Sequence, residues 1–260
     1  MPNPLISVVT PTLNQASTLE RTIRSVLEQP ANVQYIVVDG GSSDGSVDIL
    51  ERYSDRLAWW VSEADGGQSQ AINKGLQHAT GDIVAYINSD DYFTQDALGL
   101  VAKTFAREPS AAWVAGSCRY LHPDGSLDTV WMPELPVGPR ALWIRDYWYV
   151  PQASSFWRRA CVERVGGFRE DLHYAMDMEF GLRLAANGVL PLIIEDELAV
   201  RCHTTDAKSA NKDRWVPELA MIREDLRPMF STIDIARAHA YRVRRRTLRM
   251  LGRVPSRASR

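Results

Sequence analysis

The 260-residue sequence predicts an α/β protein with a mostly parallel, doubly wound sheet and a helical C-terminal extension. In the first half, short apolar runs alternate with segments of helical periodicity, which is the order that builds a parallel sheet. The run Ile83–Ile87 is apolar throughout, as expected of a strand buried on both faces. Polar clusters follow these strands, so we expect the function at the edge where the strands end.

Each element of the first half has a local signal. Leu5–Thr10 is a β-rich run that Pro11 stops. Ser17 and Glu20 fit a capping box that opens a helix ended by Pro30. Further strands are expected at residues 35–38, 57–61 and 83–87, and further helices around residues 47–53 and at 68–79.

The regular alternation continues to about residue 117 and then fails. A helix at 96–107 and a strand at 112–117 precede a hairpin, residues 119–130, around Pro123-Asp124-Gly125. Residues 131–150 are rich in Trp, Pro and Tyr without a clear period, which indicates a shaped loop. Later strands are expected at 152–157, 191–194 and 199–202, and later helices at 159–165, at 176–187 and after about 211. We find no internal repeat or linker and therefore expect one domain with an extension.

Composition is that of a soluble globular protein, with 45% hydrophobic and 24% charged residues. Cys118, Cys161 and Cys202 are odd in number and not at metal-site spacing, which favours a reducing cytosol. The start does not resemble a signal peptide, and no segment approaches the roughly 20 apolar residues of a spanning helix. We therefore expect a cytoplasmic protein that does not cross a membrane by itself.

Charge is distributed unevenly along the chain. The overall net charge is −2, yet nine arginines and no acidic residue follow Asp234, so residues 237–260 carry +9 and the remainder carries −11. Such a tail is a candidate for binding an anionic partner. We predict peripheral binding to an anionic lipid surface by a basic helix. A solvated end is the alternative, and no aromatic interleaving supports nucleic acid.

Asp90 and Asp91 place two adjacent carboxylates directly after the strand at 83–87. Like charges so close together raise each other's pKa unless a cation or donor groups compensate them. Mg²⁺ or Mn²⁺ is the simplest compensation, because both ions take carboxylate oxygens. The alternative is that one aspartate only caps a following helix.

Polar clusters at residues 10–14, 39–44, 65–74 and 88–91 all follow strands or begin helices, so a parallel sheet brings them to one edge. Backbone amides, paired carboxylates and a lysine together suit a nucleoside diphosphate with its metal. Asp39 is either a hydrogen-bond partner of base or ribose, or a turn-forming residue ahead of Gly40-Gly41. Lys74 either contacts phosphate or is a solvated helix residue.

Four passages resemble those of the inverting family 2 glycosyltransferases of GT-A fold. They read VVTPTLNQASTL (8–19), VDGGSSDGS (38–46), EADGGQSQAINKG (63–75) and GDIVAYINSDD (81–91). A fifth, YAMDMEFGLRL (174–184), is similar to the acidic motif on the acceptor side. Order and spacing agree over roughly the first 210 residues. The resemblance implies a GT-A catalytic domain over 1–210, its nucleotide-sugar half at about 1–117 and its acceptor half at about 118–210, with the basic extension at 211–260.

The resemblance also implies a donor site for a nucleoside-diphosphate sugar, most often a UDP-sugar. Its implied residues are Thr10, Pro11 and Asp39 for the nucleoside, Asp65, Lys74 and Asp90 for the rest of the donor, Asp91 and His203 for Mn²⁺ or Mg²⁺, and Lys208 for the diphosphate. The metal motif reads Ser89-Asp90-Asp91 here, which leaves open how the two aspartates divide the work.

The same resemblance assigns Asp177 as the general base, which would take the proton of an acceptor hydroxyl opposite the leaving diphosphate. The acceptor side would include Gln152, Trp157 and Glu179. The acceptor itself would be a glycan or a lipid-linked molecule. As alternatives, Asp177 caps the helix that follows, Glu179 only stands at its start, and Trp157 is a core residue.

Two other functions compete with a sugar transferase. A sugar-nucleotide pyrophosphorylase has a related sheet but needs a Gly-rich, basic loop after the first strand, where this chain has Thr10-Pro11-Thr12-Leu13-Asn14. A non-catalytic, membrane-associated nucleotide-binding scaffold would not require Asp90, Asp91 and Asp177.

Overall fold

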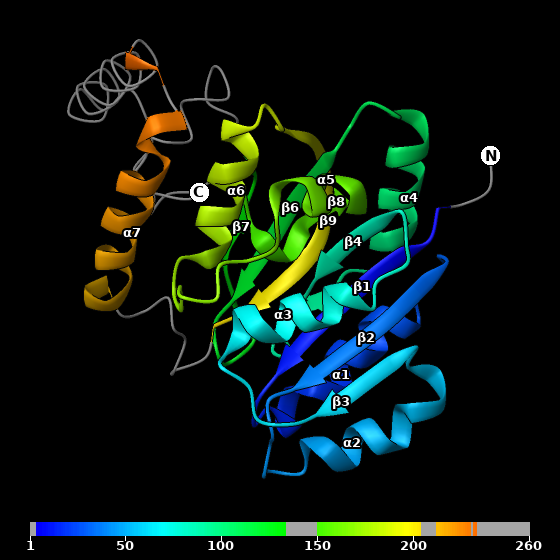
Figure 1. Cartoon of the computed structure of the whole chain (residues 1–260). Coiled ribbons are helices and arrows are strands. Elements are labelled where there is room, and N and C mark those ends of the chain that lie inside the picture. The colour runs from blue at the N-terminus through cyan, green and yellow to red at the C-terminus, as the bar shows by residue number, and fades with distance from the viewer. Residues whose placement is uncertain (1–3, 134–149, 204–211, 230, 233–260) are drawn as a thin grey trace.

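The computed structural model describes residues 4–133, 150–203, 212–229 and 231–232 (Figure 1). Three sequence predictions therefore lie outside the described residues. They are the role of Lys208, most of the loop predicted at 131–150, and the basic tail after Asp234.

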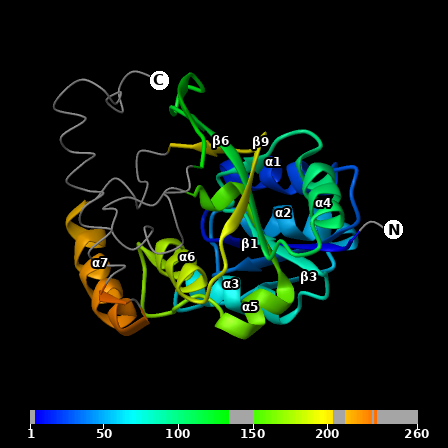
Figure 2. The same cartoon turned by 90° about the horizontal axis from the view of Figure 1, so that it is seen from above.

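A single curled sheet forms the centre of the molecule, with helices on both faces (Figures 1 and 2). The described strands are β1 (Ile6–Thr12), β2 (Val33–Asp39), β3 (Trp59–Ser62), β4 (Ile83–Tyr86), β5 (Tyr92–Phe93), β6 (Trp113–Leu121), β7 (Leu127–Trp131), β8 (Ser155–Arg158) and β9 (Pro191–Cys202). The described α-helices are α1 (Ala16–Leu27), α2 (Ser46–Tyr53), α3 (Gln68–Gln77), α4 (Ala97–Arg107), α5 (Arg159–Val165), α6 (Met176–Ala186) and α7 (Lys212–Leu226). The strand order is β3-β2-β1-β4-β8-β6-β9-β5, with β7 paired to β6.

The first half is parallel, as predicted. β1 pairs with β2 and β4, and β2 pairs with β3, all in parallel register. Successive strand residues point to opposite faces, so Val8 and Val37 pack beneath α1, α2 and α4, whereas Val9 and Val38 pack against α3 and the second half. Burial on both faces explains why these strands read as continuous apolar runs.

The second half adds antiparallel pairs. β8 lies between β4 and β6 and is antiparallel to both, and the predicted hairpin is confirmed as β6–β7. β9 runs parallel to β6 as one strand, where the sequence predicted two short ones. The polar residues Glu195–Glu197 suggested a break, but a register shift opposite Gly116 lets the strand continue. A Cβ on Gly116 would lie 2.6 Å from the Asp196 carbonyl oxygen, so the close approach requires glycine.

Two local predictions are corrected by tertiary contacts. The capping box at Ser17 is wrong, because α1 begins at Ala16 and its first amide donates to Asp44 Oδ2 at 2.8 Å from the loop after β2. Residues 152–154 form a 3₁₀ turn, so the predicted strand at 152–157 starts only at Ser155.

The helix α7 packs against α6 through the buried side chains Leu219, Ile222 and Leu226, which join the same apolar cluster as Phe180 and Leu184. Within the described residues, none of the helices has both the length and the apolar character needed to cross a bilayer.

Candidate functional site

The loop after β4 carries the carboxylate pair and is held by α1. The Asp91 amide donates to the Asn88 carbonyl at 3.1 Å, which closes a tight turn. The fully buried Thr22 hydroxyl lies 2.6 Å from the Asp91 carbonyl oxygen and 3.0 Å from that of Ser89. Arg21 donates to the Asp90 carbonyl at 3.0 Å and stacks over Tyr92. The backbone of the carboxylate pair is thus fastened from one helix.

Asp91 is a buried carboxyl group, only 1% exposed. Burial and the neighbouring Asp90 raise its pKa to about 7. Burial also raises the pKa of Asp90. The Cys202 amide donates to Asp91 Oδ1 at 3.1 Å, so β9 supplies one donor to this side chain.

Arg201 on β9 links the two halves of the site, and the sequence analysis did not identify it. It lies opposite Tyr120 in the register of β6 and β9, with its guanidinium carbon 5.7 Å from the Tyr120 ring centroid. Burial lowers its pKa, but Tyr120, Asp91 and Asp177 outweigh burial and raise it overall. Its positive charge opposes the rise in the pKa of Asp90, Asp91 and Asp177. The sequence signal that could have identified Arg201 is its position inside a predicted strand, next to the apolar residues Val200 and Cys202.

Asp177 lies in the first turn of α6, where its Oδ1 accepts a hydrogen bond from the Met178 amide at 2.7 Å. Burial raises its pKa. Tyr86, at the end of β4, has its pKa raised by burial, then by Asp177 and by Asp91. The negative charges of Asp91 and Asp177 therefore both raise the pKa of the same two side chains, Tyr86 and Arg201, although 86 residues separate the two aspartates in sequence.

Two glutamines border the same loop. Gln152 Nε2 donates to the Tyr86 carbonyl at 2.6 Å, which places this predicted acceptor residue at the end of β4. Gln68 Nε2, at the start of α3, donates to Asn88 Oδ1 at 2.7 Å.

The predicted nucleoside residues meet at the ends of β1, β2 and β3. Asp39 is fully buried, and its carboxylate accepts from the amides of Gly41 and Ser42, from the Ser42 hydroxyl, and from Ser62 Oγ at 2.6 Å. The turn-forming role weighed for Asp39 is therefore present. Asp65 lies beside this loop, because a Cβ on Gly40 would be 3.1 Å from its Oδ2.

The end of β1 is buried as well. Thr10 Oγ1 accepts from the Tyr35 hydroxyl at 3.0 Å, and Pro11 is buried in the same strand. Thr12 pairs with Asp39 in the sheet register, and its buried hydroxyl oxygen has no hydrogen-bond partner within the described residues. Lys74, on α3, forms an ion pair with Glu63.

Two predicted acceptor residues belong to the core instead. Trp157 is 4% exposed and contacts Trp113, Phe168 and Phe180, so no sugar ring can stack on it. Glu179 is 1% exposed and forms a two-pronged ion pair with Arg183, at 2.8 and 2.9 Å. The core alternative for Trp157 is the one that the structure supports. Arg183, which Glu179 binds, also donates to the carbonyls of residues 165–167 and so connects α6 to the loop after α5.

His203 lies just beyond Cys202, but its ring faces the hairpin. His203 Nε2 is 3.2 Å from Asp128 Oδ2 on β7, and the ring lies 5.7 Å from that of Tyr120. In the part of the chain that the structure describes, no three His, Cys, Asp or Glu side chains gather as a metal site. The donor set nevertheless fits a divalent cation, because the pKa values of both adjacent carboxyls remain raised despite the positive charges of Arg201 and Arg21.

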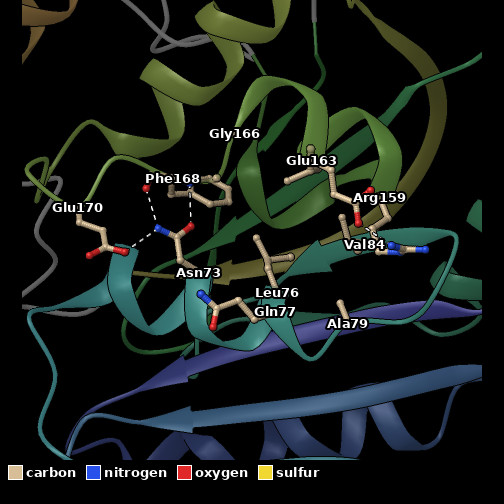
Figure 3. A pocket seen from close by; sticks show the side chains of 12 residues that line it. Asn73, Leu76, Gln77, Ala79, Val84, Arg159, Glu163, Gly166, Phe168 and Glu170 are labelled. Atoms are coloured by element: carbon tan, nitrogen blue, oxygen red, sulfur yellow. Dashed lines mark hydrogen bonds and ion pairs between the residues drawn. The ribbon is translucent and has the colours of Figure 1, made fainter.

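A pocket of about 510 Å³ lies away from the carboxylates, between α3 and α5 (Figure 3). Its floor is apolar, with Leu76, Val84 and Phe168. The polar groups at its rim bind one another: Asn73 bridges Phe168 and Glu170, and Arg159 pairs with Glu163 at 2.5 Å. The pocket therefore offers a ligand few free polar groups.

Comparison with known proteins agrees with this geometry. The profile of Glycosyl transferase family 2 matches residues 7–154. An uncharacterized glycosyltransferase of Mycobacterium tuberculosis (strain H37Rv) is 32% identical over 204 residues, which cover 76% of this chain and 73% of the relative. The putative teichuronic acid biosynthesis glycosyltransferase TuaG of Bacillus subtilis is 39% identical over 99 residues, covering 36% of this chain and 39% of TuaG.

Two solved structures share the fold. The mannosyltransferase PcManGT from Pyrobaculum calidifontis, in complex with GDP-Man and Mn²⁺, superposes with a TM-score of 0.67 at 23% identity, covering 91% of this chain and 70% of that one. S. aureus TarS 1–349, in complex with UDP-GlcNAc, gives a TM-score of 0.65 at 19% identity, with 84% and 66% coverage. At these identities the likeness establishes the GT-A fold, as predicted.

Proposed function

The chain belongs to glycosyl transferase family 2, and from this premise we propose an inverting, metal-dependent transferase that moves a sugar from a nucleoside diphosphate to an acceptor hydroxyl. One feature supports the proposal: the Cys202 amide donates to Asp91 next to Arg201 on β9, and the charges of Asp91 and Asp177, from different halves of the chain, both raise the pKa of Arg201 and of Tyr86. A metal-binding carboxylate and a base on two sides of one cleft are what a single displacement requires.

The donor in this proposal is a UDP-sugar. Thr10, Pro11, Asp39 and Asp65 would contact the nucleoside, with Lys74 nearby. The unpaired hydroxyl of Thr12 supports a polar ligand at this edge, because a buried hydroxyl without a partner is costly. TarS was crystallised with UDP and with UDP-GlcNAc, whereas PcManGT holds GDP-Man, so the fold accepts either base.

Asp91, assisted by Asp90, would hold Mn²⁺ or Mg²⁺, and His203 would join them after a change of its ring orientation. The bound ion would neutralise negative charge that develops on the departing nucleoside diphosphate. PcManGT was solved with Mn²⁺, which supports this choice of ion. Lys208 would contact the diphosphate.

Asp177 would act as general base. As the acceptor oxygen bonds to the anomeric carbon, the bond from that carbon to the diphosphate oxygen breaks, and the acceptor proton passes to the Asp177 carboxylate. Attack opposite the leaving group inverts the anomeric configuration without a covalent enzyme intermediate. Arg201 favours the ionised form that accepts a proton, while burial raises the pKa of Asp177 and so strengthens it as a base.

The acceptor is proposed to be a glycan or a lipid-linked glycan. Relatives include TuaG and a hyaluronan synthase of Pasteurella multocida, whose names indicate polysaccharide synthesis. The arginine-rich residues 237–260 would hold the enzyme at the anionic inner face of the cytoplasmic membrane, near such an acceptor.

A thermal-shift screen of nucleotide sugars with and without Mn²⁺ tests the donor and the metal together. A ligand that binds only the folded protein raises its melting temperature. We expect UDP-sugars to stabilise the protein only with Mn²⁺ or Mg²⁺, and NMR of the product to show the inverted anomer. Stabilisation that does not need the ion, or a retained anomer, would contradict the proposal.

A further inference from the structure

The helix α7 places a carboxylate at the start of α6. Both oxygens of Glu218 are used: Oε1 accepts from the His173 amide at 2.8 Å, and Oε2 accepts from the amides of Tyr174 and Ala175 at 2.9 and 2.8 Å. Three consecutive backbone donors thus converge on one side chain, which is 45 residues away in sequence. Such a nest of amides, at the positive end of a helix dipole, favours an anion.

This carboxylate binds the N-cap amide of α6 and the two amides before it. The N-cap residue of α6 is Ala175, and it makes no side-chain capping bond. The first amides of a helix have no partner within the helix and need one from elsewhere. Glu218 supplies a partner for the Ala175 amide from another element, whereas Asp177 Oδ1 binds the Met178 amide within α6. The backbone that leads into α6 therefore depends on α7.

The helix α7 is anchored independently of Glu218. Asp225, two turns further along, forms a 2.5 Å ion pair with Arg169. Leu219, Ile222 and Leu226 are buried against the α6 side of the core. The packing of α7 therefore holds Glu218 next to these amides.

We propose that Glu218 is a positioning residue: by binding the amides of residues 173–175 it fixes the first turn of α6 and hence the position of the Asp177 carboxylate. Asp177 follows Ala175 by two residues, so a shift of this turn moves the carboxylate directly. The inference rests on the proposed role of Asp177 as base, and it brings a helix outside the matched profile, residues 7–154, into the catalytic machinery.

The charge of Glu218 also affects the pKa of Asp177. In the described part of the chain, Arg201 of β9 and Glu218 of α7 change the pKa of Asp177 in opposite directions, and Asp177 raises the pKa of Tyr86 of β4. Burial raises the pKa of Asp177, Arg201 opposes this rise, and the negative charge of Glu218 adds to it. Loss of that charge should therefore lower the pKa of Asp177.

Two substitutions separate these effects, with Glu224→Ala and Glu224→Gln, at an exposed position of the same helix, as matched controls. Glu218→Ala removes the acceptors of three amides, whereas Glu218→Gln keeps an acceptor oxygen but removes the charge. Hydrogen exchange followed by mass spectrometry reports protection of residues 173–175 in the full chain. Carbon-13 NMR of labelled aspartate carboxyls, with Asp177→Asn to assign the resonance, follows the titration of Asp177 without any substrate.

We expect Glu218→Ala to raise exchange at residues 173–175 about tenfold or more, and to lower kcat by about 10- to 100-fold with donor KM unchanged. Glu218→Gln should move the Asp177 titration to lower pH, and the Glu224 variants should leave exchange, kcat and this titration unchanged. Unchanged exchange and kcat in Glu218→Ala, or equal effects from Glu224→Ala, would overturn the proposal. If instead Asp177→Asn retains full transfer, the proposed base is wrong, whatever Glu218 does to exchange.

Discussion

Replacing Asp91 with asparagine should make the metal-free protein more stable, although the substitution removes a metal ligand. The folded-state pKa of about 7 lies above the ordinary value of 3.8, so ionisation of this buried carboxyl opposes folding. The penalty is absent below about pH 3.8, grows as pH rises, and reaches about 4 kcal/mol above pH 7. Asparagine has nearly the same shape, can accept the Cys202 hydrogen bond, and does not ionise.

Urea unfolding with EDTA at pH 5 and pH 8 measures this difference. We expect Asp91→Asn to gain about 1–2 kcal/mol at pH 5 and about 4 kcal/mol at pH 8. Asp82→Asn, at an exposed position just before β4, is the control and should show no comparable gain at either pH. Mn²⁺ with UDP should then stabilise wild type but not Asp91→Asn. An advantage equal at both pH values, or equal stabilisation by Mn²⁺, would refute the reasoning.

Four further outcomes follow from the geometry. Asp177→Asn should keep Mn²⁺-dependent UDP binding by calorimetry but lose transfer by about 10²- to 10⁴-fold, and equal turnover would remove it from the base role. Thr22→Val removes the hydroxyl donor shared by the carbonyls of Ser89 and Asp91, so urea unfolding should show a free energy of unfolding lower by about 1–3 kcal/mol. Calorimetry should show a weaker Mn²⁺ affinity, and unchanged affinity would mean that α1 does not support the loop that carries Asp90 and Asp91. Glu179→Gln breaks a buried ion pair and should lower the free energy of unfolding by about 3–5 kcal/mol without changing UDP affinity; a selective rise in the KM for the acceptor would instead support an acceptor role for Glu179. A chain ending at Thr232 should co-sediment less with anionic vesicles than the full chain, and equal pelleting would exclude the basic tail as the membrane anchor.

The parallel half of the sheet could be predicted because its signals are local. Apolar runs of strand length alternate with helical periodicity, and polar residues mark where each strand ends. Since parallel strands end at one edge, the placement of Asp39 and Asp91 at or just beyond the ends of β2 and β4 follows from order alone. The mixed pairing of the second half was harder, because one continuous strand, β9, contains the polar stretch Glu195–Glu197.

The partners of individual side chains could not be predicted in this way. Asp44 caps α1 from the loop after β2, and the apparent capping box at Ser17 is unused. Trp157 has the character of both a sugar platform and a core residue, and only packing against Phe168 and Phe180 distinguishes them. Each of these outcomes depends on contacts between residues far apart in the chain.

The sequence by itself determined the fold class, the edge of the sheet where polar groups gather, and the family to which its motifs belong. Tertiary structure alone decided that Arg201 interacts electrostatically with both Asp91 and Asp177, and that Glu218 binds the backbone at the start of α6. The reason is physical: periodicity records how a residue faces its own sheet or helix, whereas a buried charge acquires its partner only when distant elements pack together.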